Sequence, residues 1–349
     1  MSAVIKSFYV KRRVLDILLN FGQSFLTQLQ SPTLAFLFGG MLLAAMGSKL
    51  TIPDAIYRFI VFMLLMRIGL HGGMEIRDAD LSALAFPAFL AAVIGCVTVL
   101  FGRVTLANLP KIQFPDAIAT AGLFGAVSAS TLAAALIILE EQNIVYEAWA
   151  PALYPFMDIP ALILAIVLAA AHKQKSNPEN SQRVKVWPIV KDSLRGSALS
   201  ALLLGILIGI LVNPVQIYDG FYNPLFKGFL SILLLIMGME AYSRIAELRH
   251  VAQWFIIYAA LAPILHGLLG FGLGYIAHIT FGFSPGGVIV LAIIASSNSD
   301  ISGPPTLRAG IPDANPSAYI GASTSVGTPI ALAVCIPLFI ALADIVFPV

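Results

Sequence analysis

The stretch SSNSDISGPP, residues 296–305, directly follows GGVIVLAIIA, residues 286–295, which is almost wholly apolar. The apolar part has the composition of a membrane-spanning helix, whereas the polar part holds four serines, an asparagine, an aspartate and two prolines. Such residues unwind a helix inside a membrane only where the freed backbone groups face protein or water. The change in composition therefore predicts two half-helices joined at a binding site.

The whole chain has the composition of a membrane protein. Of its 349 residues, 59% are hydrophobic and 11% are charged, and the mean hydropathy is +0.91. Soluble domains carry about a quarter charged residues, whereas apolar runs of about 20 residues, which recur here, can cross a bilayer as helices. The polar segments are too short for a separate soluble enzyme or nucleic-acid-binding domain. Cys96 and Cys335 lie in apolar runs, which predicts neither a disulfide framework nor a cysteine metal site.

The apolar runs predict an all-α integral membrane protein with ten transmembrane helices. Residues 1–30 are predicted to form an N-terminal interfacial segment, since their basic stretch lacks the long apolar core of a signal peptide. Residues 31–172 hold the first five spans, 173–196 a linker, and 197–349 the other five. The predicted spans are 32–48, 54–75, 83–107, 114–139, 147–172, 197–213, 224–243, 250–279, 284–309 and 316–345.

The polar linker predicts the orientation. Residues 173–196, KQKSNPENSQRVKVWPIVKDSLRG, hold six Lys or Arg and two acidic residues, which places this segment on the cytoplasmic side. Because five spans precede the linker, both termini are predicted to lie outside. The loop over 140–147, assigned outside, carries three glutamates. One basic cluster, over residues 6–13, disagrees with this orientation.

The two halves of the chain match at a single offset of 169 residues. Glycine, serine, proline and phenylalanine pairs coincide without a gap, and such matches are rarer than Leu–Leu matches in so apolar a sequence. Each half holds five spans, and an odd number forces the second half to insert upside down, as in the inverted repeats of secondary transporters. The pairs include Gly40 and Gly209, Gly69 and Gly238, Phe114 and Phe283, Ser128 and Ser297, Ser130 and Ser299, and Pro160 and Pro329.

The offset gives the opening stretch a partner, FGAVSAST at residues 124–131, which interrupts the fourth predicted span. Each interrupted span has a second half-helix that starts after the break. In an inverted repeat, the N-termini of these two half-helices point toward each other from opposite sides, and Ser130 and Ser302 are their predicted caps. Each helix start offers free N–H groups and about half a positive charge, which together suit a small monovalent anion. The predicted anion-binding residues are Gly125, Ser128, Ala129, Ser130, Thr131 and Gly303.

Carboxylate and hydroxyl oxygens at the same breaks suit a hard cation such as Na⁺. Asp300 is the leading candidate, because an aspartate deep within a span is functional by default. A structural hydrogen bond explains Asp158 as well as ion binding does. In the last span, Ser323, Thr324 and Thr328 could complete a cation shell, and helix packing explains them equally well. The candidate sodium ligands are Asp300, Ser299, Asn298, Ser302, Asp158, Ser323 and Thr324. Arg67 and Glu240, near predicted span ends, are interpreted as interfacial side chains.

Long motifs make the chain similar to a known family. The stretches QLQSPTLAFL, FGAVSAST, EAWAPALYPFMDIPAL, SSNSDISGPPTLRAGIP and ANPSAYIGASTSVGTP closely resemble the cyanobacterial sodium-dependent bicarbonate transporters of the SbtA family. The resemblance runs from about residue 20 to the end, although the basic N-terminal segment is longer and the linker shorter than is typical of the family.

The resemblance implies Na⁺-dependent symport of bicarbonate into the cell for CO₂ concentration, with Na⁺ as coupling ion and no other cofactor. It implies a homotrimer in the plasma membrane and an elevator-type motion of spans 3–5 and 8–10 against a scaffold of spans 1, 2, 6 and 7. It also implies a cytoplasmic PII-like regulator, SbtB, that binds adenine nucleotides.

Other functions fit the residues less well but stay open. A symporter of another small anion would use the same kind of site. A proton or sodium antiporter of this architecture would more usually carry two adjacent acids at the break, where only Asp300 stands. An intramembrane enzyme would need Ser128 beside a base such as His266, and nothing in the sequence brings them together. We therefore predict no catalytic residue.

Overall fold

A computed structural model describes residues 22, 26, 30, 32–78, 82–176, 186–248 and 253–347. Every regular element within these residues is a helix. The predicted interfacial segment, residues 1–30, lies almost wholly outside the described part of the chain, as do linker residues 177–185.

The described helices follow the predicted spans closely, each span being one helix or a run of consecutive helices. Short π-helical stretches, labelled η4 (Tyr218–Tyr222), η5 (Ser323–Gly327) and η6 (Ala331–Cys335), join some of them. The α-helices are α2 (Pro32–Ala45), α3 (Asp54–Asp78), α4 (Ser82–Thr105), α5 (Phe114–Gly125), α6 (Ala129–Glu141), α7 (Leu153–Ser176), α8 (Val186–Arg195), α9 (Ser197–Val212), α10 (Val215–Ile217), α11 (Asn223–Leu248), α12 (Gln253–Phe281), α13 (Pro285–Ser296), α14 (Gly303–Gly310), α15 (Pro316–Ala322), α16 (Thr328–Ile330) and α17 (Ile336–Val346).

Seven helical stretches in the described residues are long and apolar enough to cross a membrane. Three more apolar helices, Leu34–Ala45, Ser197–Val212 and Pro285–Ser296, are shorter. A helix rises 1.5 Å per residue, and the hydrocarbon core of a bilayer is about 30 Å thick. Ser197–Val212, with 16 residues, and Pro285–Ser296, with 12, are therefore shorter than this thickness. Pro285–Ser296 is short because the polar stretch that opens at Ser296 ends it.

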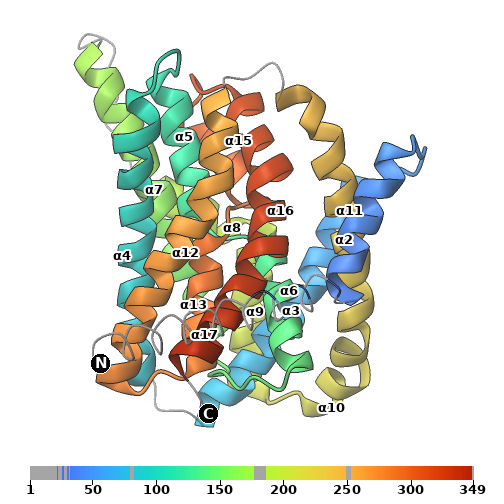
Figure 1. Cartoon of the computed structure of the whole chain (residues 1–349). Coiled ribbons are helices and arrows are strands. Elements are labelled where there is room, and N and C mark those ends of the chain that lie inside the picture. The colour runs from blue at the N-terminus through green and yellow to red at the C-terminus, as the bar shows by residue number, and fades with distance from the viewer. Residues whose placement is uncertain are drawn as a thin grey trace, which may run out of the picture.

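Two helix pairs form one side of the molecule. Helix α3 packs along α9, and α2 packs along α11, with the α2–α11 pair at one edge in Figure 1. Both contacts are close because glycines face backbone: a Cβ atom on Gly238 would overlap the Leu37 carbonyl group, and one on Gly73 would overlap that of Ile206. Small residues allow helix backbones to approach closely where lipid, rather than water, surrounds the helices.

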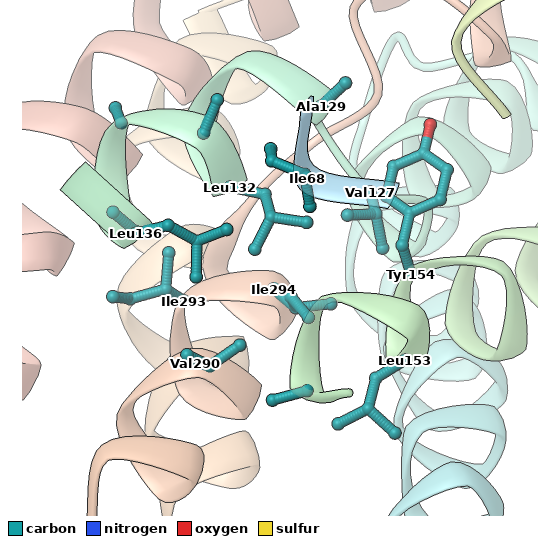
Figure 2. Packing of buried hydrophobic residues seen from close by; sticks show 14 of the residues in the cluster. Ile68, Val127, Ala129, Leu132, Leu136, Leu153, Tyr154, Val290, Ile293 and Ile294 are labelled. Atoms are coloured by element: carbon teal, nitrogen blue, oxygen red, sulfur yellow. The ribbon is translucent and has the colours of Figure 1, made fainter. Parts of the chain in front are cut away.

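The remaining helices pack into a second group that encloses the two interrupted helices. Helices α4, α5 and α7 contact one another, and α12 packs along α13. Figure 2 shows Leu132 and Leu136 of α6 beside Val290 and Ile293 of α13. Residues 129–139 and 286–296 are all buried. The interrupted helices are therefore shielded by protein, which is the condition for irregular backbone at membrane depth.

The close crossing of α2 and α11 predicts a position-specific effect of one methyl group. Gly238→Ala places a Cβ against the Leu37 carbonyl and should cost about 1–3 kcal/mol of unfolding free energy by overpacking. Gly228→Ala, on the same helix with nothing within 4 Å, should stabilise by about 0.5–1 kcal/mol. Denaturant unfolding of the purified protein in detergent measures both, and equal effects would mean that α2 and α11 do not approach as described.

Candidate functional site

The two helix interruptions lie side by side in the middle of the second group of helices. The first separates α5 from α6 at residues 126–128, and the second separates α13 from α14 at residues 297–302. Helix α6 packs on α13, and α14 packs on α5. The first turns of α6 and α14 therefore lie close together, and the two helices extend toward opposite ends of the bundle. The Ser299 N–H donates to the Leu123 carbonyl at 2.9 Å and ties the two breaks together.

The caps of the two half-helices differ from those predicted. Ser128, not Ser130, caps α6, because Ser128 is the last extended residue and its Oγ accepts from the Thr131 N–H at 3.1 Å. Ser302 does occupy the cap position of α14, but its side chain makes no capping bond. Ser299 Oγ instead accepts from the Gly303 N–H at 2.8 Å. A hydroxyl reaches an N–H about three residues ahead only from an extended residue, a geometry that sequence alone does not fix.

A chain of hydroxyl groups connects the two breaks at Asp300. Ser130 donates to Asp300 Oδ2 at 2.5 Å, and Ser128 Oγ lies 2.8 Å from Ser130 Oγ. Tyr57 of α3, which the sequence analysis did not identify, also donates to Asp300 Oδ2, at 3.3 Å. The Ser128 N–H donates to Ser297 Oγ at 3.0 Å. Predicted anion and cation residues therefore form a single network, in which Asp300 Oδ1 is left without a partner.

Asn298 joins the second break to the last helical run. Its Oδ1 accepts from Ser323 Oγ at 2.5 Å and from Thr328 Oγ1 at 2.7 Å. Nearby, Ser302 Oγ lies 3.0 Å from Ser299 Oγ and 3.2 Å from the hydroxyl of Tyr154, a second residue that the sequence analysis missed. Tyrosines are too common at membrane interfaces for Tyr57 or Tyr154 to have given a signal.

Asp158 of α7 faces the first break. Its Oδ1 accepts from the Val127 N–H at 2.9 Å, while Oδ2 is buried without a partner. Thr131 Oγ1 and Asn298 Nδ2 are buried without partners as well. Buried polar groups are nearly always hydrogen-bonded. Oxygens and N–H donors left unpaired beside two helix starts are therefore suited to a cation and an anion.

The other predicted site residues have simpler surroundings. Gly125 lies against Thr98 and Val99 of α4, and Gly303 lies against Leu123, so a Cβ atom at either glycine would come within 3.0 Å of a neighbour. Ala129 is buried in the first turn of α6. Thr324, in η5, lines the cavity described next.

A cavity of about 950 Å³ leads to one side of this network. Asp300, Thr324 and Thr328 are among the residues that line it. Its lining also includes Arg195 at the end of α8, a helix within the predicted linker, and Arg308 at the end of α14. Residues of α2, α3 and α11 form the facing wall, so the cavity lies between the two groups of helices.

Across the breaks from this cavity, an ion pair joins the two groups of helices. Arg67 of α3 is only 5% exposed and donates to both carboxylate oxygens of Glu140 of α6, at 2.9 and 3.3 Å. It also donates to Asn223 Oδ1, and its guanidinium lies over the rings of Tyr218 and Phe226. The interpretation of Arg67 as an interfacial side chain is therefore wrong. The sequence did contain a signal for burial, because Arg67 lies within the apolar run 59–70, where its guanidinium has no nearby water to contact.

The cap geometry predicts how the start of α6 responds to substitution. Ser128→Ala removes the acceptor for the Thr131 N–H and should lower the unfolding free energy by about 1 kcal/mol. Ser128→Asn should recover most of the loss, because asparagine caps as well as serine. Denaturant unfolding compares the two, and an equal loss in both variants would show that capping is not what Ser128 contributes.

Most of the chain matches a known protein family. Residues 32–344 match the model of the Na⁺-dependent bicarbonate transporter superfamily. No individual curated protein matches the chain.

Proposed function

Since the chain belongs to the Na⁺-dependent bicarbonate transporter superfamily, we propose that it imports bicarbonate by symport with sodium and binds both ions where α5–α6 and α13–α14 are interrupted. The observation that carries this proposal is the contact between the breaks. The half-buried carboxylate of Asp300, whose buried Oδ1 has no partner, is hydrogen-bonded to the first turn of a helix that begins beside it. A cation and an anion would thus bind within a few ångströms of each other.

The charges at the site give a reason for coupling. Asp158 and Asp300 are held in the bundle with no ion pair to any described residue. An uncompensated buried charge is costly, and a second anion would add repulsion. Sodium bound at these carboxylates removes both penalties, so the anion binds well only after the cation.

The direction of the hydroxyl hydrogens supplies a second route to coupling. Ser130 has one hydrogen, which it donates to Asp300, so the hydrogen between Ser128 and Ser130 must come from Ser128. Both hydroxyls therefore direct their hydrogens toward the carboxylate. A sodium ion on Asp300 competes for its lone pairs and releases the hydrogen of Ser130, which then becomes available to bicarbonate.

We further propose that all ten apolar segments span the membrane as two inverted repeats, over 31–172 and 197–349. Reciprocal packing supports this, since α3 pairs with α9 as α11 pairs with α2, and these helices correspond at the offset of 169. With the linker in the cytoplasm and both termini outside, the cavity opens inward. The plasma membrane and a role in CO₂ concentration follow from the family resemblance.

Transport would follow an elevator mechanism, in which α4–α7 and α12–α17 move against a scaffold of α2, α3 and α9–α11. The Arg67–Glu140 pair lies between these units and must separate. Arg67 would not be stranded, because Asn223, Tyr218 and Phe226 belong to the scaffold and stay with it. The homotrimer and the PII-like regulator SbtB implied by the resemblance remain part of the proposal, with the regulator on the cytoplasmic, linker side.

Replacing Asp300 tests the proposed function. Wild-type protein in proteoliposomes should take up labelled bicarbonate faster with an inward sodium gradient. Asp300→Asn should fold but show little sodium-driven uptake, and its anion binding should depend only weakly on sodium, because the amide carries no charge and can donate to Ser130. Asp54→Asn, in the same cavity wall without a contact to Ser130, is the matched control.

Three outcomes would count against the assignment. Wild-type uptake that ignores sodium contradicts symport. Competition by nitrate or acetate at concentrations equal to bicarbonate would favour another small anion as substrate. An Asp300→Asn variant with unchanged sodium dependence would shift the coupling role to Asp158.

Cross-linking tests the elevator motion. In a Cys96→Ser/Cys335→Ala parent, Arg67→Cys with Glu140→Cys places thiols on the two units, and a short bismaleimide joining them should abolish uptake. Lys173→Cys with Asp313→Cys provides the control, because that 2.7 Å ion pair lies within the proposed moving unit. Its cross-link should leave uptake within about twofold. Persistent uptake by the cross-linked 67–140 variant would rule out relative movement of these helices.

A further inference from the structure

The hydrogen bonds of Asn298 determine what its neighbours can offer a ligand. Asn298 is fully buried, and its Oδ1 already receives two hydroxyl hydrogens, from Ser323 and from Thr328. An amide oxygen has two acceptor positions, and both are in use. As a sodium ligand, Asn298 would have to give up at least one of these bonds.

The same two bonds leave the hydroxyl oxygens of Ser323 and Thr328 as acceptors. Each hydroxyl has one hydrogen, which Asn298 takes, and two lone pairs that remain. A hydroxyl held in this way cannot donate to an anion. Its oxygen is polarised by the bond it makes, which increases its attraction for a hard cation.

The π-helical turn brings these two hydroxyls together. Ser323 and Thr328 are five residues apart, and at 3.6 residues per turn they would point about 140° apart on an α-helix. Residues 323–327 instead form the π-helix η5, whose hydrogen bonds join residues five apart. This geometry places both side chains on one face, where a single oxygen accepts from both.

Gly327, on the same turn, gives Asn298 the space it needs. A Cβ atom at Gly327 would lie 2.9 Å from Asn298 Nδ2 and 2.6 Å from the ring of Phe124. Thr328 and Asp300 line the same cavity, and Ser323, which is buried, is linked to Thr328 through the shared Asn298 oxygen. The last helical run therefore presents one acceptor oxygen at the wall of the cavity that contains Asp300, and a second acceptor oxygen bonded to the same amide.

We infer that Ser323 and Thr328 are sodium ligands and that Asn298 is a positioning residue that fixes their hydroxyl hydrogens without contacting the ion. This rests on the proposed symport function and identifies which oxygens on the last helix serve it. It differs from the candidate ligands predicted from sequence in the role of Asn298, which is moved out of contact with the ion.

The experiment measures the sodium concentration that gives half-maximal bicarbonate binding. Asn298→Leu keeps the size of the side chain but removes the acceptor, so the hydroxyls rotate freely, and this concentration should rise about tenfold or more, as when other outer-shell partners are removed. Asn298→Asp retains an acceptor for both hydroxyls and should stay within about threefold of wild type. Failure of Asn298→Asp alongside Asn298→Leu would overturn the positioning role and would point to the amide N–H as the essential group.

A double-mutant cycle separates positioning from direct ligation. Thr328→Val with Ser323→Ala removes both hydroxyls. If Asn298 acts through them, adding Asn298→Leu should change the sodium requirement little further. Additive losses would mean that Asn298 contacts the ion itself and would overturn the inference.

Two further controls keep the test independent of folding and of the proposed function. Gly327→Ala displaces Asn298 and should raise the sodium requirement, whereas Gly272→Ala, with open space around it, should not. Sodium-free thermal unfolding identifies variants that fail to fold, and these are excluded. If bicarbonate binding by the wild-type protein does not depend on sodium, the proposed function fails. If it does, but Asn298→Leu has the same sodium requirement as wild type, the inference alone fails.

Discussion

The arrangement of this molecule depends on satisfying backbone groups where two buried helices stop. Inside a membrane protein no bulk water reaches such groups, and each unpaired N–H or carbonyl is costly. The first break solves this with Asp158, which accepts from the Val127 N–H, and with Ser297, which accepts from the Ser128 N–H. The second break uses the Leu123 carbonyl as the acceptor for the Ser299 N–H. Each interrupted helix therefore supplies a hydrogen-bond acceptor to the other.

This mutual dependence explains why the surrounding helices divide into two groups with different contacts. The interrupted helices need protein on all sides, and α4, α7 and α12 provide it. The paired helices α2–α11 and α3–α9 meet through glycine and backbone, which gives close packing without polar groups. The two groups meet through a shared apolar cluster, in which Ile68 of α3 lies beside Leu132 of α6 (Figure 2). The cavity lies on one side of the breaks, and the pair of Arg67 and Glu140 lies on the other. The contact between the groups is thus apolar in one part, polar at the ion pair and open at the cavity.

The sequence predicted much of this fold because composition changes sharply at the breaks. Helix α13 ends at Ser296, where a polar stretch begins, and α5 ends at Gly125, three residues before Ser128. The pairing of Ser130 with Asp300 could not be read from the sequence, since the two residues lie 170 positions apart and meet only through tertiary packing. The cap of α6 was misplaced by two residues because backbone angles, rather than residue type, decide which serine caps. Arg67 was misread because a span boundary taken from hydropathy does not show what an arginine faces.

The two acidic residues at the breaks occupy positions that the 169-residue offset does not repeat. Asp158 corresponds to Gly327, and Asp300 corresponds to Thr131. Each half of the chain therefore contributes one carboxylate, but at non-equivalent places. A perfectly twofold site would offer every ligand position twice, and an ion near the pseudo-axis would have two equal resting places. In the inverted-repeat arrangement that we propose, the departure from symmetry removes this degeneracy. The electric field at the centre would then have a definite direction, and the two ions would occupy distinguishable positions.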